Sequence, residues 1–358
     1  MTITEATAKI KLLDDKYIKL AQQRLDSLTK PRGSLGKLEA FAKALCAIYQ
    51  TDMPEMPKKG IFVFAGDHGV VQEGVSAYPS EVTPQMVFNF LRGGAGINVL
   101  AGHAGADVFV IDMGVNFVFK DCPGLINKKV VSGTNNMTKG PAMSRDEATK
   151  TIEAGISLAL EYAAKGYRLF GTGDMGIGNT TPSSAITAVL TGLSPKAVTS
   201  RGTGIDDESL IKKIKVIESA LSLNKPDKLD GLDVLSKVGG AEIGGIAGLC
   251  IGAASLGIPV VVDGFISSAG AAIACAIDKK VAAYLIGSHM SQEGGHRPLL
   301  THMGVEPLFD FNMRLGEGTG AALAMTVLDA SLKIYREMAT FAEAMVSDTD
   351  KDIHKCES

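Results

Sequence analysis

A glutamate flanked by glycines is the residue of this 358-residue sequence with the clearest chemical potential. Glu317 stands in the segment Arg314–Gly320, which reads RLGEGTG. Glycines on both sides let another molecule approach the carboxylate closely, and a carboxylate can act as a general base when a substrate proton lies within reach. The same position also suits helix capping, which needs no substrate. We expect Glu317 to remove a proton, with capping as the alternative.

A glycine-rich segment, Gly171–Pro182, follows an apolar run and precedes a helical pattern. Its sequence is GTGDMGIGNTTP, and free amides and hydroxyls at a helix start attract phosphate. No Gly-Lys-Ser/Thr follows, so it is not a Walker loop, and its spacing departs from the dinucleotide-binding GxGxxG pattern. A purely structural tight turn is the alternative. The residues that we expect to contact a phosphate are Gly176, Gly178, Asn179 and Thr180.

A second glycine segment lies near several cationic side chains. Gly202, Thr203 and Gly204 follow Arg201, and Lys213 comes shortly after them. These groups could hold a phosphate or a carboxylate, although a solvated loop would have the same composition. We also assign two further residues to substrate binding, Gly264 and Ser291.

A third motif, Asp67-His68-Gly69, follows the first apolar run. It could serve as a metal or acid/base pair, but a turn at a strand end explains it equally well. We favour the turn, and we expect no metal site.

The composition excludes several classes of function. The net charge is −3, there is no tryptophan, and aromatic residues are few, so the basic patches and stacking rings of nucleic-acid-binding proteins are missing. No run is typical of a membrane span, and Met1–Tyr17 carries charges throughout, so we expect a cytoplasmic protein without a signal peptide. The five cysteines form no CxxC pair, so neither zinc nor disulfides are indicated. A small molecule is therefore the expected ligand.

Six short apolar runs indicate how these motifs are positioned. Buried parallel strands are continuous apolar runs, and open α/β sheets bind ligands beyond the carboxyl ends of their strands. Each run ends in glycine beside an acidic or polar residue, so we expect these ends to converge on the active site. The runs are Ile61–Phe64, Val108–Ile111, Tyr167–Phe170, Val260–Val262, Tyr284–Ile286 and, less clearly, Met313–Leu315.

Strands that alternate with helical patterns predict an α/β fold with a doubly wound, mostly parallel, Rossmann-like sheet. The helical patterns between the strands are Ser144–Lys165, Pro182–Leu190, Ser209–Leu223 and Gly240–Ser255. Amphipathic helices are also expected over Glu5–Leu28, Leu38–Tyr49 and Gly320–Val346. We therefore predict an α/β domain over residues 56–320 and a small helical domain built from residues 1–55 and 321–358.

Seven segments in order give the chain a close resemblance to one family, the nicotinate-nucleotide:dimethylbenzimidazole phosphoribosyltransferases of cobamide lower-ligand assembly. The resemblance covers nearly the whole chain. The segments are KPRGSLGKLE (Lys30–Glu39), DHGVVQEGVSAYP (Asp67–Pro79), GPAMSR (Gly140–Arg145), GIGNTTPSSA (Gly176–Ala185), DGLDVLSKVGGAEIGGIAG (Asp230–Gly248), VVVDGFISSA (Val260–Ala269) and RLGEGTGAALAM (Arg314–Met325).

The resemblance implies transfer of a 5-phosphoribosyl group from nicotinate mononucleotide to an aromatic base, with inversion to the α-linkage and release of nicotinate. No cofactor is implied, because nicotinate mononucleotide is a substrate. The family's catalytic base falls on Glu317, and its second acidic residue falls on Asp174, where glutamate is expected and the reach is one methylene shorter. The family's lysine falls on Lys213. A dimer is also implied, with an active site near the subunit interface.

The residues that the resemblance places around the acceptor base are Tyr78, Met86 and Met175. They form an apolar, adaptable slot for a flat ring. The pattern therefore also resembles the phenol/p-cresol-activating branch of the family, which works as a heteromer of two related chains, and both acceptors stay open.

Two other functions fit the sequence less well. A catalytically silent, family-related subunit would have no need of the glycine-flanked Glu317. A nicotinamide-dependent dehydrogenase would need GxGxxG after the first strand, where this chain has Gly66-Asp67-His68-Gly69.

Overall fold

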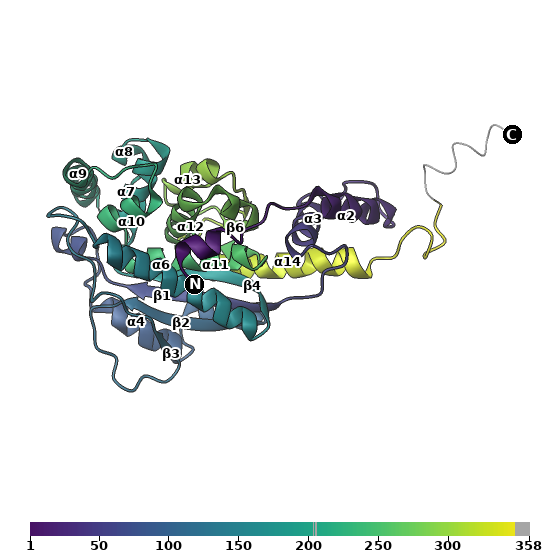
Figure 1. Cartoon of the computed structure of the whole chain (residues 1–358), viewed down its shortest axis with the longest axis horizontal. Coiled ribbons are helices and arrows are strands. Elements are labelled where there is room, and N and C mark those ends of the chain that lie inside the picture. Colours follow the sequence, from purple (N-terminus) through teal and green to yellow (C-terminus); the bar gives the residue numbers. More distant parts are fainter. Residues whose placement is uncertain (203, 205, 348–358) are drawn as a thin grey trace. The chain divides into compact units, whose positions relative to one another are not determined.

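Seven strands of the protein form a single parallel sheet (Figure 1). The structure is a computed structural model that describes residues 1–202, 204 and 206–347. The strands lie in the order β3-β2-β1-β4-β5-β6-β7, and every neighbouring pair is parallel. Their bounds are β1 Lys58–Gly66, β2 Ala106–Gly114, β3 Leu125–Asn127, β4 Tyr167–Met175, β5 Val260–Val262, β6 Leu285–His289 and β7 Pro307–Phe309. The predicted doubly wound α/β fold is confirmed.

The strand order changes direction between β1 and β4, which pair directly in the middle of the sheet. Such a switch point leaves a crevice at the carboxyl ends of the strands. Five of the six apolar runs became strands, but the prediction of a sixth at Met313–Leu315 was wrong. Asn312 and Gly316, on either side of it, have φ values of +55° and +79°, which an extended strand cannot contain. The last strand is β7 instead; like β3 it is a half-buried edge strand and lacks a long apolar run.

Helices cover the sheet, and their packing depends on glycine. α11 (Ala241–Ser255) lies along α6 (Arg145–Ala164), and a Cβ on Gly248 would overlap the carbonyl oxygen of Ile152. The other helices in the part of the chain that contains the sheet are α1 Ile3–Thr7, α4 Val82–Leu91, α5 Gly96–Ala104, α7 Thr180–Thr191, α8 Pro195–Val198, α9 Asp207–Asn224, α10 Gly231–Val238, α12 Phe265–Ile277 and α13 His296–Met303. Two 3-10 turns, η1 Gly69–Glu73 and η2 Lys279–Tyr284, accompany them. The described helices contain none that is long and apolar enough to span a bilayer.

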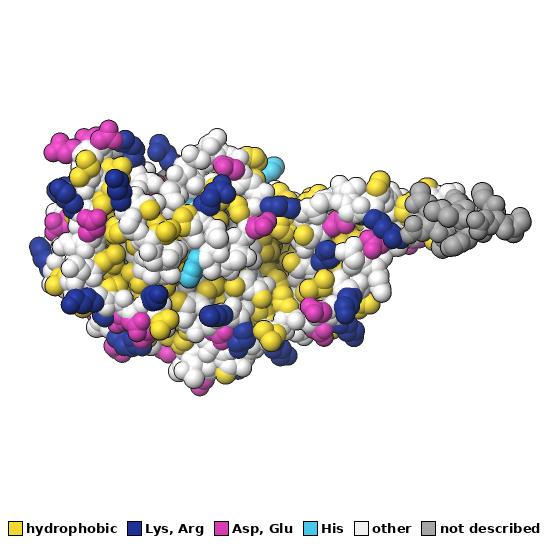
Figure 2. Space-filling model, turned by 90° about the horizontal axis from the view of Figure 1, so that it is seen from above, with side chains coloured by type: hydrophobic (Ala, Val, Ile, Leu, Met, Phe, Trp, Pro, Cys, Tyr) yellow, Lys and Arg dark blue, Asp and Glu magenta, His cyan; other side chains and the backbone are white. Residues whose placement is uncertain are grey.

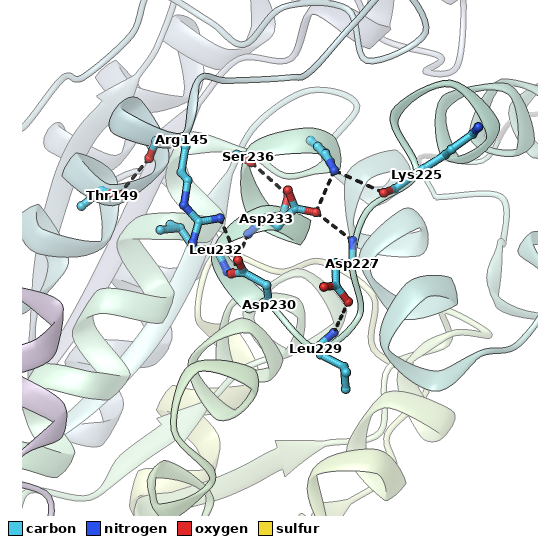
Figure 3. Close-up of polar contacts among 10 residues, drawn as sticks. Arg145, Thr149, Lys225, Asp227, Leu229, Asp230, Leu232, Asp233 and Ser236 are labelled. Carbon is cyan, nitrogen blue, oxygen red and sulfur yellow. Dashed lines mark hydrogen bonds and ion pairs between the residues drawn. The ribbon is translucent and has the colours of Figure 1, made fainter.

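Figure 3 shows how polar contacts fix the start of α10 beside α6. The carboxylate of Asp230 accepts hydrogen bonds from the backbone N–H groups of Leu232 and Asp233, both at 3.1 Å, and so caps α10. Its other oxygen pairs with Arg145, the first residue of α6, at 2.8 Å. This capping fixes the N-terminal end of α10, whose C-terminal end leads into α11.

The described chain divides into two compact units. One consists of Met1–Lys11 with Pro57–Ala324, and the other of Leu12–Met56 with the chain from Met325 onward. The placement of Met1–Lys11 differs from the expected helical domain over residues 1–55. Lys280 Nζ donates to the carbonyl oxygens of Thr7 and Ile10, and Tyr284 donates to that of Lys11. These contacts attach the N-terminal segment to the sheet unit.

The smaller unit contains α2 (Asp15–Ser27), α3 (Lys37–Tyr49) and the later turns of α14 (Thr319–Glu337). The predicted helix Glu5–Leu28 is therefore two helices, because residues 8–14 leave the helical path. The predicted helix Gly320–Val346 ends at Glu337, since Thr340 then pairs with Leu28 in an antiparallel bridge. The core of this unit consists of Ala21, Leu25, Leu28, Ala42, Cys46 and Tyr335.

The surface carries both signs of charge. On the face that Figure 2 shows, basic and acidic side chains are interspersed among apolar ones. This distribution agrees with the small net charge of the chain, −3.

Candidate active site

A cavity of about 420 Å³ lies where β4, β5 and β6 end. Its wall comes from the last residues of β4, the start of α12, the end of β6, the N-terminal end of α4 and the loop before α14. The predicted site residues that line it are Tyr78, Met86, Asp174, Met175, Gly176, Asn179, Thr180, Gly202, Gly264, Ser291 and Glu317. The convergence of strand ends thus brings together most of the residues selected from sequence.

Glu317 occupies an unusual backbone conformation. Its φ is +63°, and its neighbours Gly316 and Gly318 have φ values of +79° and +97°, so three successive residues are left-handed. A non-glycine residue in this region is strained, and such strain persists where the surroundings impose it. Gly173 on β4 provides the space, because a Cβ there would lie 2.7 Å from the carbonyl carbon of Glu317. Asp263 anchors the loop by accepting a hydrogen bond from Gly318 N at 3.1 Å.

The carboxylate of Glu317 is both buried and hydrogen-bonded. Oε2 accepts the backbone N–H of Ile97 at 3.1 Å, in the first turn of α5. Burial raises the pKa of Glu317, while the hydrogen bond from Ile97 N lowers it and the charge of Asp263 raises it further. The capping alternative is thus realised, but on a helix far away in sequence, and the residue still lines the cavity.

Asp174 lies at the end of β4 and faces the Glu317 loop. Its Oδ2 accepts a hydrogen bond from the side-chain amide of Asn179 at 2.9 Å, and a Cβ on Gly316 would lie 3.4 Å from its Oδ1. Burial raises the pKa of Asp174 well above its ordinary value, and the negative charge of Asp263 adds to this. The hydrogen bond from Asn179 opposes this rise, because it stabilises the ionised carboxylate.

The expected phosphate loop leads into α7, which begins at Thr180. Lys213 Nζ donates to Thr180 Oγ1 at 2.7 Å, and its side chain is almost fully buried. Burial lowers the pKa of Lys213 to about 8, against the opposing charge of Glu293. A helix N-terminus beside a lysine is suited to an anion. Lys213 itself does not line the cavity, nor do Gly178 and Gly204, and Thr203 lies outside the described residues.

Sequence reasoning left out nine residues of the cavity wall. Arg314, Leu315 and Gly316 belonged to the recognised glutamate motif, and His289 ended a recognised apolar run. Glu293 had no local signal, and the other members look like ordinary core residues. The complete set is Val82, Ile177, Phe265, Ile266, His289, Glu293, Arg314, Leu315 and Gly316.

Asp67 and His68 do not line this cavity. His68 Nε2 lies 2.7 Å from Glu242 Oε1 in a fully buried pair. Burial lowers the pKa of His68, but the charge of Glu242 raises it and the net shift is upward. A Cβ on Gly176 would lie 3.2 Å from His68 Nε2, so the pair packs beneath the glycine loop. Within the described ranges, no cluster of three or more His, Cys, Asp or Glu side chains is arranged to hold a metal ion.

Comparisons with known proteins identify the family of this chain. A family model described as phosphoribosyltransferase matches residues 10–346. A nicotinate-nucleotide–dimethylbenzimidazole phosphoribosyltransferase of Geobacter sulfurreducens is 57% identical over 97% of this chain and 99% of its own length. A protein of the same name from Geotalea uraniireducens is 58% identical over 97% and 98%. The solved structure of CobT from Thermus thermophilus has a TM-score of 0.89 and 46% identity, covering 93% of this chain and 99% of that one. The chain is therefore an enzyme that belongs to the nicotinate-nucleotide:dimethylbenzimidazole phosphoribosyltransferase family.

Proposed function

We propose that this enzyme transfers the 5-phosphoribosyl group of nicotinate mononucleotide to an aromatic lower-ligand base, giving an α-riboside phosphate and nicotinate for cobamide synthesis. The observation that carries the proposal is the placement of Glu317. Its buried carboxylate, with a raised pKa, shares one cavity with the N-terminal end of α7. A general base and an anion site in one cavity are what this transfer needs.

The reaction asks for little beyond positioning and proton removal. The pyridinium of the nucleotide leaves from C1′ as neutral-ring nicotinate and keeps the electron pair of the broken bond. The lone pair of the unprotonated ring nitrogen of a benzimidazole, or of a phenolic oxygen, attacks C1′. Glu317 takes the proton that the acceptor carries on its other ring nitrogen or on its hydroxyl. Positioning two reactants and removing a proton are contributions that a rigid cavity can supply.

The anion site accounts for the nucleotide's phosphate. Thr180 is the first residue of α7, and its hydroxyl accepts a hydrogen bond from the buried ammonium group of Lys213. A phosphate bound by Gly176, Asn179, Thr180 and Gly202 would face partial positive charge from the helix. Gly264 and Ser291 complete the nucleotide side of the cavity.

The acceptor side is the apolar part of the wall. Tyr78, Met86 and Met175 line it together with Val82 and Leu315. The relatives are named for dimethylbenzimidazole, which favours that acceptor. An adaptable methionine-lined slot also suits phenol or p-cresol, and this acceptor is the second candidate. We further propose that the enzyme works as a dimer, of two identical chains or with a paralogous chain.

The test is turnover of nicotinate mononucleotide by the purified protein. Incubation with dimethylbenzimidazole, and separately with p-cresol, should release nicotinate and form an N-linked or O-linked riboside phosphate that mass spectrometry distinguishes. If product forms with dimethylbenzimidazole but not with p-cresol, the phenolic acceptor is without support. Absence of product with either acceptor, alone or with a paralogous chain, would instead favour a catalytically silent subunit.

A further inference from the structure

Three buried side-chain atoms on the cavity wall have no hydrogen-bond partner among the described residues. They are Asp174 Oδ1, Glu293 Oε2 and His289 Nε2. Buried polar atoms are normally paired, so an unpaired set on a cavity wall indicates where a ligand bonds. Asp174 faces the Glu317 loop, and Glu293 experiences the charges of Lys213 and Arg314. His289 is left on the wall beside Gly264, with a side chain that is 1% exposed.

The hydrogen bonds around His289 determine what its Nε2 can do. Ser288 Oγ donates its proton to the carbonyl oxygen of Asp263 at 2.7 Å, so it can only accept from His289 Nδ1, 3.2 Å away. Asp263 Oδ1, at 3.9 Å, also favours a proton on Nδ1. In the neutral ring Nε2 is then a hydrogen-bond acceptor. The ring of Phe309 lies nearly parallel to that of His289, at an interplanar angle of 19° and with 6.3 Å between the ring centroids.

Nicotinate mononucleotide has few groups that can donate to such an acceptor. Its ionised phosphate and its carboxylate only accept, and its pyridinium ring carries no N–H. The donors that remain are the 2′ and 3′ hydroxyls of the ribose. Gly264 lies next to His289, since a Cβ there would be 3.6 Å from Nε2, so a sugar can approach this wall without a side chain in between.

We propose that His289 Nε2 accepts a hydrogen bond from one ribose hydroxyl of the nucleotide substrate and thereby makes the enzyme selective for ribonucleotides over the corresponding deoxynucleotide. The proposal rests on the proposed function, because it takes nicotinate mononucleotide as the substrate. It assigns His289 to substrate binding, with no part in proton transfer.

Two amide variants separate the ring nitrogens. In His289→Asn the amide can reach Ser288 but not the position of Nε2, whereas in His289→Gln an amide oxygen can reach that position. We expect kcat/KM for nicotinate mononucleotide to fall roughly ten- to a hundredfold in the Asn variant, the usual effect of leaving one buried group unpaired, and less in the Gln variant.

The deciding measurement uses 2′-deoxy and 3′-deoxy nicotinate mononucleotide as alternative substrates. The wild-type enzyme should use one of them roughly ten- to a hundredfold less well than the ribonucleotide, and for that analogue the Asn variant should cause little further loss. An equal loss for all three nucleotides, or no loss for the ribonucleotide, would overturn the proposal.

Separate control experiments test whether each variant folds and whether the proposed function itself holds. Thermal unfolding of each variant shows whether it is folded, and if His289→Asn does not fold, the wild-type comparison still decides, since equal use of both deoxy analogues contradicts the proposal. Wild-type turnover of nicotinate mononucleotide tests the proposed function itself. A wild-type enzyme that is active but indifferent to the hydroxyls would refute His289 alone.

Discussion

At the scale of single residues, the proposed chemistry of this enzyme centres on one carboxylate, that of Glu317. Glu317 caps α5 through Oε2 and lines the cavity in a left-handed conformation that glycines on both sides support. A capping bond fixes the orientation of the carboxylate, and fixed orientation is what a general base requires. The capping bond of Glu317 is therefore compatible with its proposed role as a general base.

Replacing Glu317 by Gln tests this role. The amide oxygen can still accept the N–H of Ile97, so the fold and nucleotide binding should persist, while kcat falls roughly 10²- to 10⁴-fold because no base remains. Steady-state kinetics with a binding titration of the nucleotide would check both halves. Near-normal kcat would remove Glu317 from the mechanism.

The pH profile gives a second prediction for the same residue. A general base must be deprotonated, so if Glu317 has the proposed role, activity should rise with pH through its pKa. Burial and the charge of Asp263 raise the pKa of Glu317, and Asp174 is a second buried carboxyl group close to it. The acid limb of kcat/KM should therefore lie above the ordinary glutamate value of 4.5. The limb should disappear from the residual activity of Glu317→Gln. A limb at or below 4.5 that persists in the variant would belong to another group.

At the scale of elements, the glycines at strand ends provide room for backbone rather than for ligand alone. Gly173 on β4 lies against the backbone of Glu317, and a Cβ there would be 2.9 Å from Gly318 N. Gly176 likewise lies against the end of β1, where a Cβ would overlap the carbonyl oxygen of Gly66. The strand β4 therefore positions the Glu317 loop by direct packing.

Gly173→Ala should displace the Glu317 loop without changing any group that contacts substrate. We expect kcat to fall by roughly tenfold or more, because small displacements of a catalytic group are costly. The matched control is Gly102→Ala in α5, where a Cβ meets no atom within 4 Å, and which should keep full activity and gain about 1 kcal/mol of stability. Equal activity of the two variants would show that the loop position is not set by β4.

At the scale of the whole molecule, segments far apart in sequence are joined by a few polar contacts. Lys280, in η2, holds the N-terminal segment of the sheet unit through the carbonyl oxygens of Thr7 and Ile10 at 3.1 and 3.0 Å. Ala6 and Ile10 are buried, so this segment is part of the unit's packed structure.

Lys280→Met should loosen this N-terminal segment. Both carbonyl oxygens lose a charged donor, so we expect several-fold faster cleavage by thermolysin between residues 1 and 11, with a destabilisation of about 1–2 kcal/mol for a partly exposed lysine. Lys279→Met, at the exposed neighbouring position, is the control. Mass spectrometry of the digest locates the cut, and identical digestion of both variants would show that burial of Ala6 and Ile10 suffices.

The sequence by itself determined the parallel sheet and predicted the edge of the sheet at which the candidate site lies. Continuous apolar runs that end in glycine are a local signal, and parallel strands bring their ends to one edge, so Gly176, Gly264 and Glu317 could be selected without a structure. The signal failed at Met313–Leu315 because the left-handed residues beside it were not visible as such.

Only the tertiary structure decided which distant residues meet. Glu317 bonds to Ile97 across 220 positions, and Lys213 reaches Thr180 from another helix. The proposed role of His289 depends on Ser288 and Asp263, whose hydrogen bonds favour a proton on Nδ1 and leave Nε2 as the acceptor. Burial, charge coupling and hydrogen-bond partners depend on packing between elements, and local sequence patterns carry no information on that packing.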